Sequence, residues 1–339
     1  MACLRPCPIA HPAGNYLSHT VERRFSWTGT PDRTCRIGRL AAQSVSPDEP
    51  SRAAVPRRPA VRAAMRRRAN RRLRGALDAA SIPVWTPRPV QDASSPLVLS
   101  QAPGWLPPGE RLYVVGGVRG CLDAWWTLWA SIEADQARRP AGRARIVLLG
   151  NVIGPGPDSA GVLALLANNR DATTVLRGAN EQTLLEALDG DDAAATDWLH
   201  GGGAVALRGW GVPDGAPRTV WGAHIPPAHV AFLCGLPSSQ RVGGYFLAPA
   251  GVRPGVPLAR QSPEDTRAIR QVFLSSEQPF GAVVVHGHSV APDPEVRFNR
   301  LGIDTGAGFG GRLTCAVLEQ DQLAFISVAT KGSPPVKRA

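Results

Sequence analysis

The chain has 339 residues, 43% of them hydrophobic, which is enough to fold as one large domain or two smaller ones. It contains no apolar run of about 18 residues and no C-x-x-C pair, so neither a membrane-spanning helix nor a zinc site built from thiolates is expected. Its formal net charge of +11 favours a nucleic-acid-binding protein only if that charge lies on the folded part.

The positive charge is confined to the beginning of the chain. Residues 1–90 contain 17 arginines and 5 acidic residues, whereas the rest of the chain is nearly neutral. Residues 1–64 mix proline, arginine and serine without apolar periodicity. Met65, the only methionine besides Met1, opens a basic stretch and is an alternative start, which would leave residues 1–64 outside the natural protein. Only this basic arm has the charge to bind nucleic acid, and we expect it to be disordered and solvated instead.

The composition predicts one folded region between two polar segments. We expect residues 1–104 to be a basic arm and a proline-rich linker, residues 105–330 to be the folded domain, and residues 331–339 to be a disordered tail. We expect no membrane partner, and we expect the protein to be cytoplasmic.

The first half of the folded region alternates short apolar strands with helices. Strands are predicted at residues 112–115, 146–149 and 173–176. Helices are predicted after them, over residues 122–132, after an N-cap at Asp158, and over residues 181–188. Apolar strands separated by helices indicate a parallel sheet covered on both faces, in which ligands bind beyond the carboxyl ends of the strands.

Tryptophans recur in the first of these helices. Trp125, Trp126 and Trp129 lie at helical spacing with Leu122 and Ile132, which indicates a core stripe. A ligand platform is the alternative interpretation of the same residues.

The second half contains more strands. They are predicted at residues 245–248, 282–285, 313–318 and 323–326, and the last two are close enough to form a hairpin. A short helix is predicted over residues 225–236, begun by two prolines. Residues 189–212 are rich in glycine, alanine and aspartate, which indicates a surface insertion.

Short glycine-containing motifs follow the predicted strands. Residues 116–120 read G-G-V-R-G, residues 150–156 read G-N-V-I-G-P-G and residues 177–181 read R-G-A-N-E. Further along the chain are A-P-A-G-V at 248–252, H-G-H-S at 286–289, and I-D-T-G-A at 303–307 followed by G-G-R-L-T.

In order and spacing these motifs resemble those of the calcineurin-like metallophosphoesterases, which include bacterial serine/threonine protein phosphatases and diadenosine tetraphosphate hydrolases. That family has G-D-x-H-G, G-D-x-x-D-R-G, R-G-N-H-E, V-H-A-G-V and H-G-H-T at these points. The resemblance covers about residues 111–320. It implies an α/β four-layer sandwich, in which two mixed β-sheets are flanked by helices. In active members it also implies two divalent metals (manganese, iron or zinc) that activate a water molecule.

This chain departs from the family at most of the implied metal ligands. Arg119 replaces a histidine ligand, and its permanent positive charge repels a metal ion. Asn151 replaces the bridging aspartate, and His288 alone is unchanged, so these two are remnant metal positions. The positions left without a side-chain donor are Gly117, Ala179 and Pro249.

The implied catalytic residues are also replaced. Asn180 stands at the position of the family's acid histidine, and an amide cannot donate a proton near neutral pH, so no catalytic residue is intact. Gly154 and Pro155 replace an orienting aspartate and a phosphate-binding arginine. Arg119 and Arg177 are the candidate phosphate-binding residues that remain.

We therefore expect a degenerate phosphoesterase, or pseudophosphatase, which needs no cofactor and binds a phosphorylated ligand or a phosphoprotein. One alternative is a residual phosphatase that uses two divalent metals to act on a phosphoprotein or a dinucleoside polyphosphate. Another is the product of a gene that is losing its function through random mutation, although such mutations would also have altered the glycines and strands.

A serine esterase is the alternative from a different class. Residues 287–291 resemble a nucleophile elbow with Ser289 as the nucleophile, and His200 begins an H-G-G-G segment that resembles an oxyanion loop. The chain order of such enzymes requires a histidine after the serine. No histidine follows His288, so the general base is missing, and the H-G-G-G segment is more simply a flexible loop.

Overall fold

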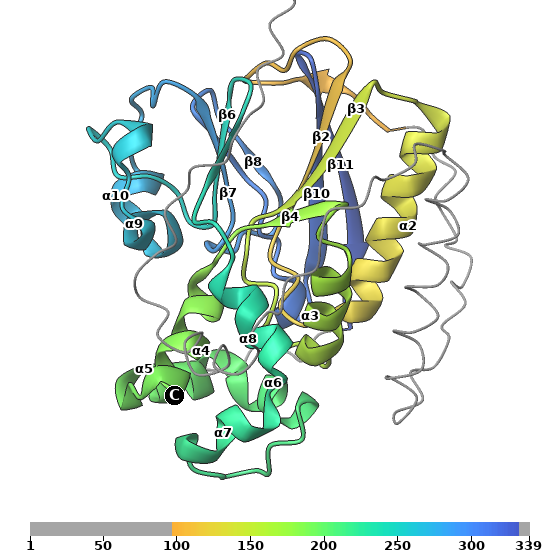
Figure 1. Cartoon of the computed structure of the whole chain (residues 1–339). Coiled ribbons are helices and arrows are strands. Elements are labelled where there is room, and N and C mark those ends of the chain that lie inside the picture. Colours follow the sequence, from red (N-terminus) through yellow and green to blue (C-terminus); the bar gives the residue numbers. More distant parts are fainter. Residues whose placement is uncertain (1–96, 332–339) are drawn as a thin grey trace, which may run out of the picture. The chain divides into compact units, whose positions relative to one another are not determined.

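The computed structural model describes residues 97–331, in which two β-sheets face each other and helices flank them (Figure 1). Most of the predicted arm, including Met65, and the tail after Lys331 lie outside the described residues. No helix in residues 97–331 has the length and apolar character needed to span a membrane.

Within that range the first sheet has six strands in the order β1-β11-β10-β2-β3-β4. β2, β3 and β4 run parallel, whereas β10, β11 and β1 pair antiparallel. The strands are β1 (Ser100–Gln101), β2 (Glu110–Val115), β3 (Arg143–Leu148), β4 (Thr173–Val175), β10 (Arg312–Glu319) and β11 (Gln322–Ala329).

The second sheet has five strands in the order β5-β6-β7-β9-β8, again counted over the described residues. β6, β7 and β9 run parallel, and an antiparallel strand closes each edge. The strands are β5 (Gln240–Val242), β6 (Tyr245–Ala248), β7 (Val283–His286), β8 (Glu295–Val296) and β9 (Arg300–Gly302). Both sheets are therefore mixed, as the resemblance implied, and the three strands for which the pattern predicted parallel pairing, β2, β3 and β4, do run parallel.

Helices lie on the outer side of each sheet. In Figure 1, α2 and α3 lie beside the first sheet, and α9 and α10 lie beside the second. The longer helices are α2 (Leu122–Arg138), α3 (Ser159–Asn168), α4 (Ala179–Asp189), α5 (Asp192–Trp198), α6 (Ala204–Gly209), α7 (Arg218–His224), α8 (Pro227–Cys234), α9 (Pro263–Ala268) and α10 (Gln271–Leu274). A π-helical turn spans Leu199–Gly203, and 3-10 helical turns span Leu258–Arg260 and Ala307–Phe309.

Alternating side chains of the strands divide the core into three hydrophobic layers. In β2, Tyr113 and Val115 pack against the helices, whereas Leu112 and Val114 pack against the second sheet. In β7, Val283 and Val285 face the first sheet, and Val284 packs against α10. The two sheets and the helices outside them form four layers, with the three hydrophobic clusters between them. This is the predicted four-layer α/β sandwich, and the predicted fold class is confirmed.

Most predicted elements are found within a few residues of their expected bounds. Asp158 accepts a hydrogen bond from the Gly161 N–H (2.6 Å) and caps α3 as predicted. The predicted hairpin is β10 and β11, which pair from Arg312 with Ala329 to Glu319 with Gln322. The predicted helix over 225–236 is α8, with a proline at its first position.

Two segments are more ordered than their composition indicates. Residues 189–212, which the composition indicates as a surface insertion, form α5, a π-helical turn and α6, and they bury Trp198, Leu207 and Trp210. Order also begins before residue 105, because β1 pairs with β11 and Ala102 is buried. Both segments gain their structure from distant parts of the chain, which composition alone does not reveal.

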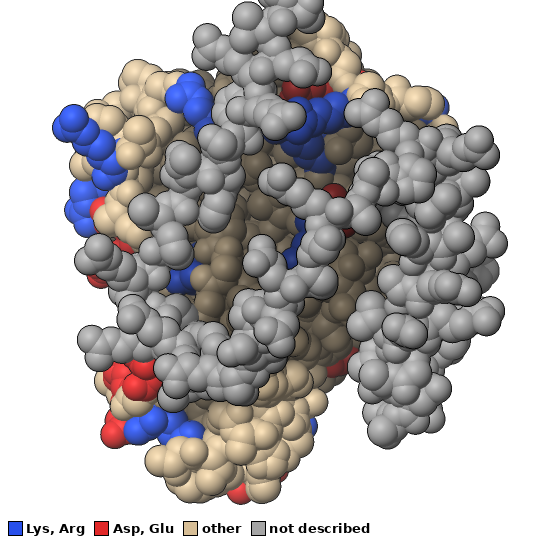
Figure 2. Space-filling model, in the orientation of Figure 1, with Lys and Arg blue, Asp and Glu red and all other residues tan. Residues whose placement is uncertain are grey.

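The charged side chains give no sign of a continuous basic surface on the visible face. In Figure 2, lysine and arginine lie interspersed with aspartate and glutamate among uncharged residues, as far as the described residues are visible. This agrees with the near-neutral composition of the chain after residue 90.

Candidate functional site

The motifs lie where parallel strands end. Residues 116–120 follow β2, residues 150–156 follow β3 and Arg177 follows β4, which are parallel neighbours in the first sheet. In the second sheet, residues 287–289 follow β7 and Asp304 lies just after β9. The predicted placement of the motifs at carboxyl strand ends is confirmed, and this is where α/β sheets bind ligands.

Hydrogen bonds join the first three motifs. The Arg119 N–H donates to the Asn151 carbonyl (2.8 Å), and the Asn151 side-chain oxygen accepts the Asn180 N–H (3.0 Å). The Asn180 side-chain amide in turn donates to the Ile153 carbonyl (2.8 Å). Asn151 therefore uses its side-chain oxygen to hold the first turn of α4.

The buried Glu181 side chain holds the same loops in place by hydrogen bonds. Its fully buried carboxylate accepts four main-chain N–H bonds of 2.7–3.2 Å, from Gly178 and from three consecutive residues beginning at Asn151. Burial raises the pKa of Glu181, and the four main-chain donors oppose this by favouring the ionised form. Glu181 thus has a structural role at the site.

Backbone strain gathers at the motif residues. Four residues other than glycine have a positive φ within 97–331, and three of them are Arg119 (51°), Asn151 (49°) and His288 (62°). The fourth, Gln320, lies in the turn between β10 and β11. Left-handed backbone is uncommon for such residues and clusters at functional sites, so the strained backbone marks these loops as the candidate site.

Arg119 connects the two sheets through a buried ion pair. Its Nη2 lies 2.8 Å from Oδ2 of Asp304, and the two side chains are 7% and 1% exposed. Asp304 Oδ1 also accepts the Gly306 N–H (3.2 Å), and the guanidinium lies over the Phe309 ring, 5.0 Å from its centroid. Gly308 makes room, because a Cβ there would lie 2.8 Å from the Arg119 Cβ. A guanidinium therefore supplies the positive charge beside this carboxylate.

Two histidines at the end of β7 complete the site. The pKa of His288 is lowered to about 4, because burial disfavours the imidazolium and Arg270 and Arg119 repel it. The pKa of His286 is also lowered to about 4, mainly by burial, and its ring packs edge-on against Phe273 with centroids 4.9 Å apart. Both rings are neutral near pH 7.

Arg177 is directed elsewhere. Its guanidinium bonds to the Gln182 side chain (3.3 Å) and to the carbonyl of Cys234 at the end of α8. Hydrogen bonds join Arg119, Asn151 and Asn180, and Arg119 also pairs with Asp304, but these two hydrogen bonds of Arg177 reach none of them. The phosphate-binding role of Arg177 stays a prediction without support from its contacts.

The side chains do not fit a two-metal centre. Asn151 already bonds the N–H of Asn180, and Asp304 is paired with Arg119, so neither oxygen set is available to a cation. Within residues 97–331, no three histidine, cysteine, aspartate or glutamate side chains are grouped closely enough to hold a metal ion.

The serine esterase alternative gains no support. Ser289 Oγ has no hydrogen-bond partner within the described residues, so no base contacts it. His200 is exposed, and the H-G-G-G segment forms a helical turn rather than a flexible loop.

The motif comparison did not single out Asp304 or His286. Asp304 was noted only as part of a well-matched final motif. An arginine at the position of a metal ligand requires a nearby carboxylate, since a buried guanidinium needs a counterion. That requirement is the available signal for Asp304, and the available signal for His286 is its place as the first residue of the H-G-H-S motif.

No family model and no curated protein matches the chain. Solved structures resemble it, among them a "putative diadenosine tetraphosphatase" at 22% identity and a TM-score of 0.48, covering 67% of this chain and 98% of that one. A metallophosphoesterase from Sphaerobacter thermophilus has 14% identity and a TM-score of 0.39, covering 65% and 88%. A protein serine/threonine phosphatase from Saccharomyces cerevisiae has 9% identity and a TM-score of 0.38, covering 68% and 82%.

These are likenesses of fold at low TM-scores, and the assignment rests on the chain's own architecture. Two facing mixed sheets, helices on both outer sides, and five motifs in order at the strand ends make a calcineurin-like metallophosphoesterase fold.

Proposed function

We propose that this chain is a pseudophosphatase, which binds a phosphorylated ligand or partner at the strand ends without two-metal hydrolysis. The proposal is carried by the buried ion pair between Arg119 and Asp304, where the family would bind metal. Removing one partner of a buried pair costs about 3–5 kcal/mol, so a metal ion would have to displace the guanidinium against that cost.

Unpartnered polar atoms around this pair support an anionic ligand. Arg119 Nε, His288 Nε2 and Ser289 Oγ are all buried without a hydrogen-bond partner in the described part of the chain. Arg119 also contributes to the lowered pKa of His288, so the two side chains lie within electrostatic range. Buried polar atoms in folded proteins almost always have partners. A phosphate group offers oxygen acceptors to a guanidinium, a neutral imidazole N–H and a hydroxyl at once.

Main-chain donors add to this support. The N–H groups of Gly117 and Val118, directly before Arg119, donate no hydrogen bond within residues 97–331. Free main-chain N–H groups at a strand end, beside a guanidinium, are a combination that binds phosphate.

The chemistry of the site favours binding over hydrolysis. Asn180 occupies the position of the acid, has no titratable proton near neutral pH, and has its amide engaged with the Ile153 carbonyl. Without a proton donor and a metal-activated water molecule, a bound phosphate ester meets neither requirement for cleavage by the family's mechanism.

The test uses the full-length protein in metal-free buffer, titrated calorimetrically with inorganic phosphate and with a phosphoserine peptide. We expect saturable binding that weakens at least roughly tenfold in Arg119→Met/Asp304→Asn, which removes both charges together. Arg208→Gln, at an exposed arginine, is the matched control and should bind as the unmodified protein does. Equal binding by the double variant would contradict the proposal.

The same protein supplied with manganese tests the residual phosphatase. Hydrolysis of p-nitrophenyl phosphate that is lost in His288→Ala, together with stoichiometric bound manganese, would establish the enzyme instead. We expect no turnover above that of the His288→Ala variant.

A further inference from the structure

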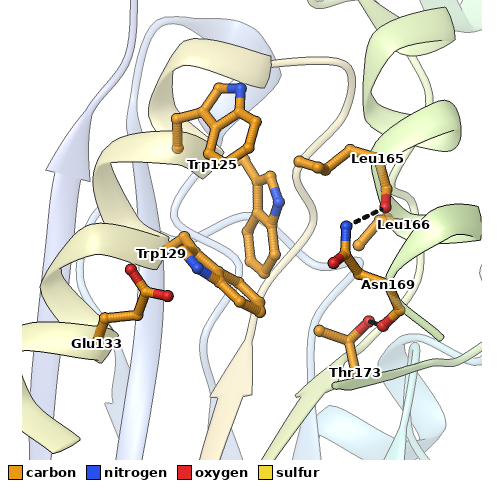
Figure 3. A pocket seen from close by; sticks show the side chains of 8 residues that line it. Trp125, Trp129, Glu133, Leu165, Leu166, Asn169 and Thr173 are labelled. Carbon is orange, nitrogen blue, oxygen red and sulfur yellow. Dashed lines mark hydrogen bonds between the residues drawn. The ribbon is translucent and has the colours of Figure 1, made fainter. Parts of the chain in front are cut away.

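The tryptophan stripe of α2 is only partly used by the hydrophobic core. Trp125 is buried, but Trp126 and Trp129 are half-buried, and all three line a cavity of about 200 Å³ between α2 and α3 (Figure 3). The rings of Trp125 and Trp129 meet edge to face with centroids 5.6 Å apart. None of the residues that line this cavity belongs to the motifs at the strand ends.

The one charged side chain among those that line the cavity is acidic. Glu133 lies one helical turn beyond Trp129 and two turns beyond Trp125, so the three share a face of α2. Its carboxylate is exposed and forms no ion pair within the described residues. The cavity therefore has negative charge at its rim, and no cationic side chain is among the residues that line it in the described part of the chain.

Hydrogen bonds on the opposite wall leave acceptors rather than donors. The Asn169 amide donates to the Leu165 carbonyl (2.8 Å), and the Thr173 hydroxyl donates to the Asn169 carbonyl (3.2 Å). The side-chain oxygen of Asn169 remains an acceptor, and Figure 3 shows it on the side of α3 that faces the tryptophans.

Indole faces, a carboxylate and an amide oxygen share a preference for positive charge. The face of an indole ring carries negative potential and attracts a cation at close range. A neutral apolar ligand would fill the space but leave the polar acceptors without partners, and an anion would be repelled.

We propose that this cavity binds an organic cation, a guanidinium or a quaternary ammonium group, between the indole rings and the Glu133 carboxylate. The cation has two available sources. One is a small molecule in solution, and the other is an arginine from the first 90 residues of the chain, which contain 17.

The experiment titrates the full-length protein with choline and with arginine methyl ester, followed by tryptophan fluorescence and calorimetry. Neutral compounds of matching shape, 3,3-dimethyl-1-butanol and citrulline methyl ester, are the ligand controls. We expect dissociation constants of about 1 mM for the cations and binding roughly tenfold weaker for the neutral compounds. Trp129→Leu should weaken cation binding about tenfold and Glu133→Gln about threefold, whereas Glu277→Gln, at an exposed glutamate elsewhere, should have no effect.

A second variant distinguishes the sources of the cation. It replaces the six arginines between residues 66 and 74 by glutamine. Tighter choline binding by this variant would show that these six arginines compete for the cavity, and equal binding would exclude them as its occupant. The proposal is overturned if neither protein prefers the cations to the neutral compounds, or if Trp129→Leu binds them unchanged.

Discussion

Strand β2 has a buried arginine near each end, and the two are satisfied very differently. Arg111, near its start, bonds both oxygens of Glu319 (2.9 and 3.0 Å), the Tyr113 hydroxyl and the Arg139 carbonyl. Arg119, just beyond its end, has one side-chain hydrogen bond to Asp304, and its Nε has no partner in the described part of the chain.

The surroundings of the two arginines differ in the same way. Near Arg111, the Asp135 carboxylate accepts hydrogen bonds from the Tyr113 hydroxyl (2.7 Å) and from two nitrogens of the Arg139 guanidinium (2.9 and 2.8 Å). These bonds complete a closed network. Near Arg119, the side chains of His288 and Ser289 each bury a polar atom without a partner. A structural network satisfies its own members, whereas a binding site leaves donors for a ligand, and this contrast supports the strand-end site.

The largest effect is expected at the closed network. Arg111→Met removes the buried guanidinium and leaves the buried Asp135 and the half-buried Glu319 with fewer partners, so the free energy of unfolding should fall by about 3 kcal/mol. Urea denaturation measures this loss. Arg145→Met, which breaks the more exposed pair with Glu110 (3.2 Å), should cost no more than about 1 kcal/mol. Equal losses in both variants would remove the contrast between buried and exposed pairs.

The ion pair at the strand ends should respond differently to single and double substitution. Arg119→Met leaves Asp304 buried without its counterion and should lower the free energy of unfolding by about 3 kcal/mol. Arg119→Met/Asp304→Asn removes both charges and should return to within about 1 kcal/mol of the unmodified protein. Phosphate binding should stay lost in both, which separates stability from binding. Recovery of binding in the double variant would make the pair purely structural.

Acid should affect His286, at the end of β7, and Asp135, which packs against the start of β2, over different pH ranges. The pKa of His286 is about 4 in the folded protein and about 6.5 unfolded, so the unfolded chain binds more protons between these values. The contribution of neutral His286 is complete above about pH 6.5 and is lost as the pH falls toward 4, by about 2–3 kcal/mol. His286→Leu should flatten this part of the stability profile measured by urea denaturation.

The pKa of Asp135 is also lowered, but in a carboxyl group this favours the charged form rather than the neutral one. Its pKa is lowered by the hydrogen bonds from Arg139 and Tyr113, which outweigh burial, the largest single influence and one that raises it. Its contribution is present above its unfolded pKa and is lost only as the pH falls through the lower folded value. His286→Leu leaves the contribution of His288, whose pKa is also lowered to about 4, so His286→Leu/His288→Leu is needed to expose the carboxylate loss that begins below about pH 4. A slope near pH 6 that persists in this variant would assign it to another group.

The smallest effect is expected at an exposed pair outside both regions. Arg208 and Asp214 lie 3.1 Å apart with side chains 51% and 75% exposed. Arg208→Gln should change the free energy of unfolding by less than about 0.5 kcal/mol and leave phosphate binding unchanged, because solvent screens such pairs. A larger change would mean that arginine content in general, rather than burial, explains the effects at β2.

Local patterns in the sequence predicted much of the fold. Strands β2, β3 and β10, helix α2 and the Asp158 cap all depend on residues close together in the chain, where apolar periodicity and capping chemistry are decisive. The same holds for the position of the motifs directly after strands. The replacements at Gly117, Arg119 and Asn180 are likewise evident without coordinates.

Other features required contacts between distant residues. The segment 189–212 becomes helical because Trp198 and Leu207 join the core, although its composition is that of a loop. The partner of Arg119 lies 185 residues away, and Arg177 turns to a carbonyl 57 residues away. The cavity beside Trp129 likewise exists only because α3 packs across from α2.

The sequence by itself determined the strands β2, β3, β6, β7, β10 and β11, the helices α2, α3, α4 and α8, and the glycine-containing loops that follow the strands. Tertiary structure alone decided which charged groups meet, which donors remain without partners and which tryptophans stay outside the core. The physical reason is that periodicity and turn chemistry act over a few residues, whereas ion pairing and burial depend on the packing of two sheets against each other.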